Sequence, residues 1–409
     1  MAAIAGEYIS DAELVAAARK GLYSKSRLLS PDAAQAAIQD LKLWIGEELA
    51  FEESASASFG RILSELWHTE YLDQLPPLLN RFERLASAYF VRRGSVTAFH
   101  GFCSAWREGM LRRILLFAEE GPDLNDQGHP PAPYAFLASG SVGRREQTLE
   151  EAERYFLIWT GGEAGYFEQF SYRVMALLDQ CGLIGKEGPA SLGRTLWRGS
   201  LDDWCNLVDG APQLQDQSSR LELLADLRHL CGDEAIGRET VRLGRLRLER
   251  SRGNAEFLKL AREVVAVPVA LGILGGIRVD RSGEHSGCFN PEKTGLYPLV
   301  SAVRWLAAQH DLDPGPTLDR LAALRSVGVL EEALAERLSA SYHLLAGLKI
   351  RREIALEHPY LNPASLTDSE NQNLKKALET VRQLQRLIRR LYLGKARKRL
   401  LAKMVSGER

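Results

Sequence analysis

Apolar side chains recur at steps of three and four residues through most of the chain, and this spacing predicts amphipathic helices. The pattern begins near Asp11 and runs to about Glu120, with Ser30 and Pro31 forming a cap and first turn for the second of these helices. It returns after Gly232. The helices predicted there span residues 255–267, 296–309, 317–324, 331–354 and 369 onward. Both ends of the chain are therefore expected to be helical.

The middle of the chain has a different pattern. A tract rich in Gly and Pro, residues 121–133, breaks all periodicity and predicts a loop. Two short apolar runs follow, 134–138 and 155–159, and predict strands joined through a Gly/Ser turn. Residues 221–228 fit a third strand or a helix, because periodicity alone does not separate these for a short apolar run. These elements predict an α+β domain between two helical regions.

The predicted domain boundaries follow from these changes of pattern. They are 1–112 for an N-terminal helical region, 113–235 for the α+β domain and 236–409 for a C-terminal helical bundle. Trp197 and Trp204 flank a pair of aspartates on what we expect to be one amphipathic helix, where they pack in the core or at its rim, with base stacking as the alternative. The glycine-rich segment 271–277 lacks the spacing of a dinucleotide-binding turn, so we interpret it as a packing turn.

Composition narrows the class of partner. The 409-residue chain has a formal net charge of −1, so it has no overall field that would attract nucleic acid or an anionic membrane. No run approaches the roughly 18 apolar residues of a membrane span, and the N-terminus lacks the pattern of a signal peptide. Its 5 cysteines are scattered without metal-site spacing. We expect a soluble, cytoplasmic protein that contacts neither membrane nor nucleic acid.

The turn between the two predicted strands has the chemistry of a phosphate site. Gly140 and Gly143 let the backbone approach a phosphate, and Ser141 has a hydroxyl that can donate to one. Arg144 and Arg145 carry guanidinium groups that can neutralise phosphate oxygens in a bidentate manner. We therefore predict that these five residues bind a nucleotide, with a nucleoside triphosphate as the ligand.

The whole segment Gly140-Ser-Val-Gly-Arg-Arg-Glu-Gln-Thr-Leu149, preceded by an apolar strand, closely resembles the bacterial nucleotidyltransferase-like family related to protein-PII uridylyltransferase. The resemblance extends from about Phe99 to about Leu393. It implies a nucleotidyltransferase fold of the polymerase-beta-like type, with a mixed sheet, followed by a helical substrate-binding domain. It also implies Mg²⁺ ions that are held by carboxylates and bridge the triphosphate.

Two downstream segments carry the resemblance further. Residues 225–233 are similar to the family's Asp-x-Arg segment, which implies that Asp226 is a third metal-binding carboxylate and that Arg228 contacts the nucleotide. Residues 283–296 are similar to the Asp-x-Lys-Lys-x-Gly-Leu signature of the helical domain. There Asn290 replaces the Asp and Glu292 the first Lys, whereas Lys293 is retained and is expected to contact the nucleotide.

The family's paired metal-binding Asp residues are missing where the resemblance places them. In a gapless alignment they correspond to Ala152 and Arg154, and an Ala and an Arg cannot hold Mg²⁺. Arg154 would even place a cation where the metal should lie. Glu151 and Glu153 have the same one-residue gap, but a bulge is required to bring them onto the face of the strand that the Asp pair occupies.

Three functions follow as hypotheses. The first is a catalytically impaired family member, a pseudoenzyme that binds a nucleotide or a protein partner in a regulatory, signalling role. The second is an active Mg²⁺-dependent nucleotidyltransferase that transfers UMP or AMP to a protein such as a PII-type signal protein, with Glu151, Glu153 and Asp226 as catalytic residues and metal ligands. The third is a purely structural interaction module.

Overall fold

The computed structural model describes residues 31–120, 130–150, 154–162, 164–183, 196–208, 217–272, 275–313 and 315–394. Contacts divide the chain into two compact units, Met1–Gly109 and Met110–Arg409. The helix expected to begin near Asp11, most of the loop after Glu120, and the alternative metal ligands Glu151 and Glu153 lie outside the described residues.

The described part of the N-terminal unit is helical, as its apolar spacing predicts. It contains α2 (Pro31–Trp67), the short η1 (Leu72–Gln74), α3 (Leu75–Arg93) and the start of α4 (Val96–Glu119). Glycine at position 94 ends α3 in the left-handed region, with φ of 66°, and its N–H donates to the carbonyl of Phe90. Aromatic rings fill the interior of this unit: Phe82 stacks on Trp106 with ring centroids 4.8 Å apart. This helical layer is held together by apolar packing.

The second unit contains a mixed four-stranded sheet in the order β3-β2-β1-β4. Its strands are β1 (Tyr134–Ser139), β2 (Arg154–Trp159), β3 (Leu196–Ser200) and β4 (Arg228–Gly232). The central strand β1 is antiparallel to both β2 and β4, whereas β2 and β3 are parallel. The predicted α+β class and the strands at 134–138 and 155–159 are confirmed. The edge strand β3 was not predicted, because its five residues include Arg and Gly and carry no clear apolar pattern.

Helices cover both faces of this sheet, which explains why β1 and β2 are apolar on both sides. On one face, Phe167 of α6 (Ala164–Gln180) stacks on Trp159 with ring centroids 4.7 Å apart. On the other, Trp204 of α8 (Leu201–Val208) contacts Phe156. Trp204 is buried in the core, as expected, and contacts Trp197; the prediction that both lie on one helix is wrong, because Trp197 belongs to β3.

The ambiguous segment 221–228 contains the end of a helix and the start of a strand. Helix α9 (Gln217–Ala225) ends immediately before Asp226, and β4 begins at Arg228. Helix α10 (Glu234–Ser251) then packs against β4 and β1, with Asp233 as its N-cap. The predicted domain boundary after residue 235 therefore falls within the first turn of α10.

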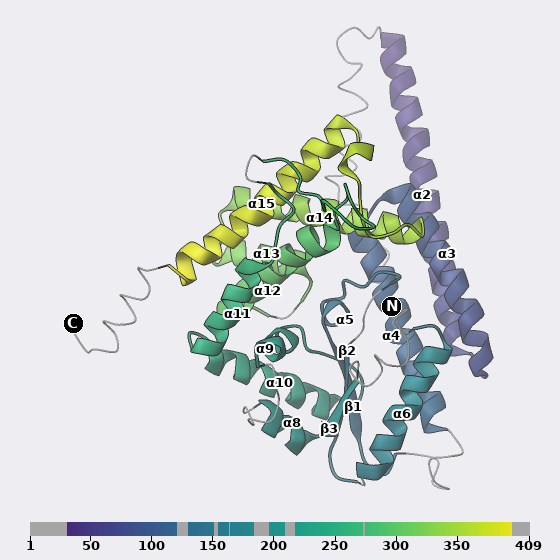
Figure 1. The fold of residues 1–409 in the computed structure, drawn as a ribbon. Coiled ribbons are helices and arrows are strands. Elements are labelled where there is room, and N and C mark those ends of the chain that lie inside the picture. Colours follow the sequence, from purple (N-terminus) through teal and green to yellow (C-terminus); the bar gives the residue numbers. More distant parts are fainter. Residues whose placement is uncertain are drawn as a thin grey trace. The chain divides into compact units, whose positions relative to one another are not determined.

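The C-terminal part of this unit is a helical bundle. It comprises α11 (Ala255–Ala266), η3 (Glu292–Leu296), α12 (Tyr297–Gln309), α13 (Thr317–Ser326), α14 (Glu332–Ile354), η4 (Pro363–Ser365) and α15 (Asp368–Tyr392). Thr367 and Glu370 form a capping box that starts α15, which lies along α14 (Figure 1). The stripe predicted on α15 is buried from Leu374 to Ile388, whereas its last member, Leu391, is exposed.

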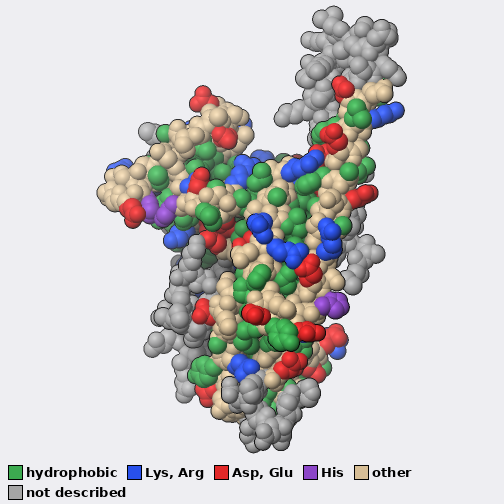
Figure 2. All heavy atoms as spheres, turned by 90° about the vertical axis from the view of Figure 1, so that its right-hand side faces the viewer, with side chains coloured by type: hydrophobic (Ala, Val, Ile, Leu, Met, Phe, Trp, Pro, Cys, Tyr) green, Lys and Arg blue, Asp and Glu red, His purple; other side chains and the backbone are tan. Residues whose placement is uncertain are grey.

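Two remaining expectations concern the surface and a turn. Leu271 and Ile277, at the two ends of the glycine-rich segment, form an isolated antiparallel bridge, which fits the predicted turn, and residues 273 and 274 lie outside the described residues. Acidic and basic side chains are interspersed over the face in Figure 2. Within the described ranges, no helix combines the length and the apolar character needed to span a membrane.

Candidate functional site

The predicted phosphate turn connects β1 to a single helical turn, α5 (Ser141–Arg144). Gly140 precedes it with φ of 73°, a conformation that favours glycine, and its carbonyl accepts a hydrogen bond from the N–H of Arg144 at 2.9 Å. Arg145 ends α5 in the left-handed region with φ of 58°. Ser141 is half-buried and Arg145 is exposed.

The backbone of this turn lies against the protein's own chain. A Cβ added at Gly143 would overlap the carbonyl oxygen of Asp226, so glycine is required at this position for close approach of two backbone segments. Arg228 donates from Nε to the carbonyl of Gly143 at 3.1 Å and from Nη2 to that of Val142 at 2.8 Å. Two residues predicted to bind phosphate thus fasten α5 to the start of β4.

Arg144 and Asp226 are brought together in the interior. The Nη1 atom of Arg144 lies 2.5 Å from Oδ2 of Asp226, and its Nε donates to Glu146 at 2.7 Å. The side chain of Asp226 has 0% exposed surface. The guanidinium that was expected to face a triphosphate is therefore engaged with two buried carboxylates.

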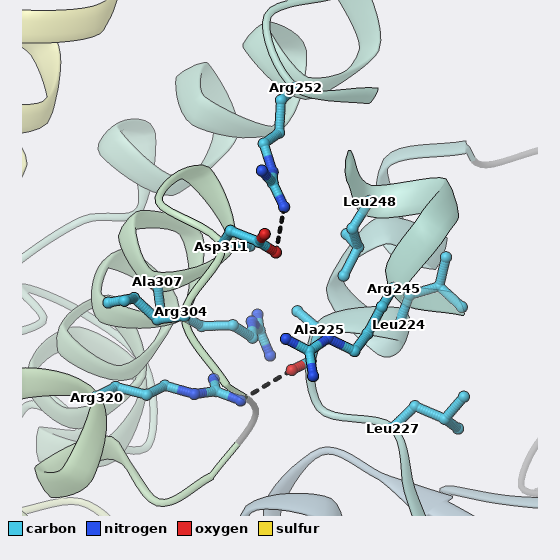
Figure 3. Close-up of a pocket in the computed structure, with 12 residues that line it drawn as sticks. Leu224, Ala225, Leu227, Arg245, Leu248, Arg252, Arg304, Ala307, Asp311 and Arg320 are labelled. Carbon is cyan, nitrogen blue, oxygen red and sulfur yellow. Dashed lines mark hydrogen bonds and ion pairs between the residues drawn. The ribbon is translucent and has the colours of Figure 1, made fainter. Parts of the chain in front are cut away.

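Two helices of the C-terminal bundle add further arginines to Asp226. Arg304 of α12 approaches Oδ2 at 3.1 Å and also pairs with Glu222 at 2.7 Å. Arg320 of α13 approaches Oδ1 at 2.7 Å and donates to the carbonyl of Ala225 at 2.8 Å. Figure 3 shows Arg304 and Arg320 directed toward Ala225 from the same side of a narrow pocket.

We call these six residues the buried charge cluster: Arg144, Glu146, Glu222, Asp226, Arg304 and Arg320. It contains three positive and three negative side chains, so its formal charges balance. Glu146 also accepts a hydrogen bond from the backbone N–H of Thr317 at the start of α13. The cluster joins the predicted phosphate turn to the C-terminal bundle through charged hydrogen bonds and ion pairs.

The surroundings of Asp226 determine its protonation. Burial by itself raises the pKa of this carboxyl, but the guanidinium groups of Arg144, Arg320 and Arg304 outweigh burial and hold the pKa well below its ordinary value. Asp226 is therefore ionised at neutral pH. Its negative charge is compensated by three arginines.

The residues described around the turn do not fit Mg²⁺. Both carboxylate oxygens of Asp226 already face guanidinium groups, and a divalent cation would have to displace them. Arg154 begins β2 opposite Ser139 with an exposed side chain, on the strand face that also bears Phe156. Among the described residues, no group of three or more His, Cys, Asp or Glu side chains is arranged to hold a metal ion.

Lys293 occupies a different part of the surface. Its backbone N–H donates to the side chain of Asn290 at 2.9 Å, and its own side chain is exposed. The chain beyond α5 reaches the neighbouring helix α14, where Glu353 accepts hydrogen bonds from Thr148 at 2.9 Å and from the N–H of Leu149 at 3.2 Å. Asn290, which replaces the family's Asp, accepts the hydrogen bond from the N–H of Lys293 and thus acts as a helix-cap residue.

Three of the predicted nucleotide-binding residues line one cleft. Gly143, Arg145 and Arg228 contribute to a cleft of about 730 Å³ that lies beside the C-terminal end of α5. Ser141, at the other end of α5, and Lys293 are not among its lining residues. The structure therefore separates the predicted nucleotide-binding set into residues of this cleft, residues of the buried charge cluster and residues elsewhere.

Arg304 and Arg320 were not predicted to be site residues. Arg304 is the single charged residue in a mostly apolar helical run, Leu299–Ala308, and Arg320 follows Asp319 in the otherwise apolar run Leu318–Leu324. A charged side chain in such a run is rarely fully buried unless it is paired, so this pattern predicts a buried partner. The partner itself was not identifiable, because it lies 78 residues away from Arg304 in the chain.

Comparison with known families supports the resemblance drawn from the sequence. The family model described as “Putative nucleotidyltransferase DUF294” matches residues 80–217, and the one described as “Putative nucleotidyltransferase substrate binding domain” matches residues 254–392. No curated protein matches the chain. The two matches cover the sheet up to α8 and the C-terminal bundle from α11 to α15.

Proposed function

We propose that this chain, which belongs to the nucleotidyltransferase-like family with a C-terminal substrate-binding domain, binds a nucleotide as a regulatory signal and does not transfer it. The observation that carries the proposal is the state of Asp226. Oδ2 lies within ion-pair distance of Arg144 and Arg304, and Oδ1 of Arg320, so a divalent cation would have to displace buried guanidinium groups.

The residue that begins β2 supports the same proposal. Arg154 stands where the family resemblance implies a metal-binding Asp, and a cation at this position repels Mg²⁺. Nucleotidyl transfer through two metal ions requires carboxylates that bring both ions to the substrate phosphates. Neither Asp226 nor Arg154 meets this requirement, so we expect binding without chemistry.

The decisive assay measures transfer of labelled nucleotide. The full chain is incubated with labelled ATP or UTP and Mg²⁺ or Mn²⁺, and we expect no covalent label on the chain or on an added PII-type acceptor protein. The variant that combines Ala152→Asp with Arg154→Asp is the matched comparison, because it restores the two missing carboxylates. Transfer by the natural chain that is abolished in Glu153→Ala would overturn the proposal and favour an active enzyme.

Binding is tested separately by calorimetry. We expect ATP or UTP to bind the natural chain in the presence of EDTA as well as with Mg²⁺, because arginine side chains and backbone N–H groups bind phosphate without metal. If no nucleotide binds under either condition, the regulatory part of the proposal is wrong. In that case the structural-module hypothesis is favoured.

A further inference from the structure

The cleft beside the C-terminal end of α5 is lined by three of the residues predicted to bind a nucleotide, whereas Ser141 does not line it. Its volume of about 730 Å³ falls within the range of roughly 300–1,000 Å³ that is typical of small-molecule sites. Four elements line it: the end of α5, the start of β4, α10 and the segment from residue 311 to α13. It is therefore a separate concavity of ligand size.

The two walls of this cleft carry opposite charges. One wall presents Arg145, Arg228 and Arg238, which come from the turn, from β4 and from α10. His229 lies on the same wall, and burial lowers its pKa, so it is neutral at pH 7. The other wall, from residue 311 to α13, presents carboxylates at positions 311, 313 and 319 and one arginine, Arg320, which pairs with Asp226. A ligand that fits both walls needs an anionic group at one end and hydrogen-bond donors at the other.

Several of these charged side chains already form ion pairs within the protein, which limits the contacts that they can make with a ligand. Asp311 pairs with Arg252, and Asp313 with Arg245 at 2.8 Å. Arg238 pairs with Glu234 on the same helix at 2.8 Å, but both side chains are more than 70% exposed, so this pair is weak and easily exchanged. Asp319, in the first turn of α13, is the acidic residue of this wall for which the described part of the chain provides no ion pair.

The same elements also contribute apolar side chains to the cleft. The side chains there are Leu227, Val241, Leu312, Pro316 and Ala323. Apolar surface of this kind suits the face of a planar ring, and the charged walls suit groups at either end of it. A free amino acid has complementary charges but leaves most of the volume empty. A nucleic-acid strand would meet repulsion from the acidic wall.

We infer that this cleft binds a nucleoside phosphate. In this arrangement the phosphates contact the arginine wall at Arg145 and Arg238, the base covers the apolar surface, and ribose hydroxyls donate to Asp319. The inference deepens the proposed function and rests on it in taking the ligand to be bound and not transferred. Arg320 lines the cleft and also contacts Asp226, so the ligand adjoins the buried charge cluster.

The first test compares two arginines of α10. Arg238 lines the cleft, whereas Arg242 does not; each pairs with one Glu of the same helix and is largely exposed, at 71% and 60% of the side chain. Calorimetry of the full chain with ATP and with UTP in EDTA is expected to show about tenfold weaker binding for Arg238→Ala. Arg242→Ala should bind like the natural chain.

The outcomes of this test are distinct. Weaker nucleotide binding that is confined to Arg238→Ala, with unchanged circular dichroism and thermal midpoint, supports nucleotide binding in the cleft. Equal affinities for Arg238→Ala and the natural chain overturn it, because the nucleotide then binds elsewhere. Absence of ATP and UTP binding by the natural chain also overturns it.

The second test separates the sugar and base from the phosphates. Inorganic triphosphate is titrated beside ATP into the natural chain and into Asp319→Ala. We expect the substitution to weaken ATP binding but to strengthen triphosphate binding, because it removes a hydroxyl acceptor and also a negative charge from the cleft. Equal affinity of the natural chain for ATP and triphosphate would contradict a nucleoside site.

Failure of this inference and failure of the proposed function are distinguishable. Covalent labelling with Mg²⁺ overturns the proposed absence of transfer, whereas the cleft is tested by reversible binding in EDTA. A chain that binds ATP equally well after Arg238→Ala keeps its regulatory proposal and loses only this site.

Discussion

The interior of the N-terminal unit and the buried charge cluster of the second unit stabilise the chain by different means. In the N-terminal unit, Phe59 stacks on Phe102 and Phe82 on Trp106, with contacts that depend on shape and apolar area. In the charge cluster, Asp226 is surrounded by three arginines that belong to three different helices. One interior depends on volume and the other on charge and direction.

This difference determines how each interior responds to a small change. Apolar cores tolerate substitutions that conserve volume, because dispersion and burial are not directional. A buried ion cluster does not, because removal of one charge leaves its partners desolvated and unpaired. The predicted phosphate turn depends on the second kind of interior, so its shape should be sensitive to changes that conserve volume.

The largest effect is expected from Asp226→Asn, which conserves shape and removes one charge. It leaves Arg144, Arg304 and Arg320 with fewer negative partners in a buried site, and we expect a loss of roughly 3–5 kcal/mol in the free energy of unfolding at pH 7. Urea unfolding measures it. The control is Glu234→Gln, which removes an exposed partner of Arg238 and should change stability little. A loss no larger than the control's would contradict the structural role of Asp226.

The next largest effect is expected in how the stability difference between the natural chain and Asp226→Asn depends on pH. The pKa of Asp226 is lowered in the folded protein, so its contribution is complete above the ordinary carboxyl pKa near 3.8 and is lost as pH falls from there toward the folded pKa. The gap in unfolding free energy between the natural chain and Asp226→Asn should therefore be constant at neutral pH and narrow below about pH 4. Unfolding curves at several pH values check this. A gap that widens on acidification would show that the sign is wrong.

A smaller loss is expected from Gly143→Ala. The added Cβ overlaps the carbonyl oxygen of Asp226, which is backbone and cannot rotate away, so we expect a cost of roughly 1–3 kcal/mol from the forced backbone shift. The matched control is Gly165→Ala in α6, whose Cβ would meet no atom within 4 Å. Thermal unfolding compares the two variants. Equal midpoints for both would contradict the close approach at Gly143.

The smallest effect is expected in the aromatic interior. Phe82→Leu keeps an apolar side chain of similar volume beside Trp106, and we expect a loss below roughly 1.5 kcal/mol. Denaturation followed by tryptophan fluorescence measures it. If this loss equalled that of Asp226→Asn, the proposed difference between the two interiors would not hold.

The sequence predicted several elements closely because their signals are local. The strands at 134–138 and 155–159 and the bundle helices up to α15 match the structure within a few residues, since apolar spacing, caps and glycine turns act over short distances. The family resemblance also rested on contiguous residues, Gly140 to Leu149. Its fold and family were confirmed for that reason.

The partners of the turn residues were decided only by the tertiary structure. Gly143, Arg144 and Arg228 have the chemistry of a phosphate site. The sequence does not show that Gly143 lies against the carbonyl of Asp226 or that Arg144 pairs with the carboxylate of Asp226. Nor does it show that Arg228 donates to two backbone carbonyls of α5. Those partners lie more than 80 residues away, and whether a guanidinium faces a ligand or a buried aspartate depends on how distant segments pack. Residue type therefore determined which interactions were available, and packing selected among them.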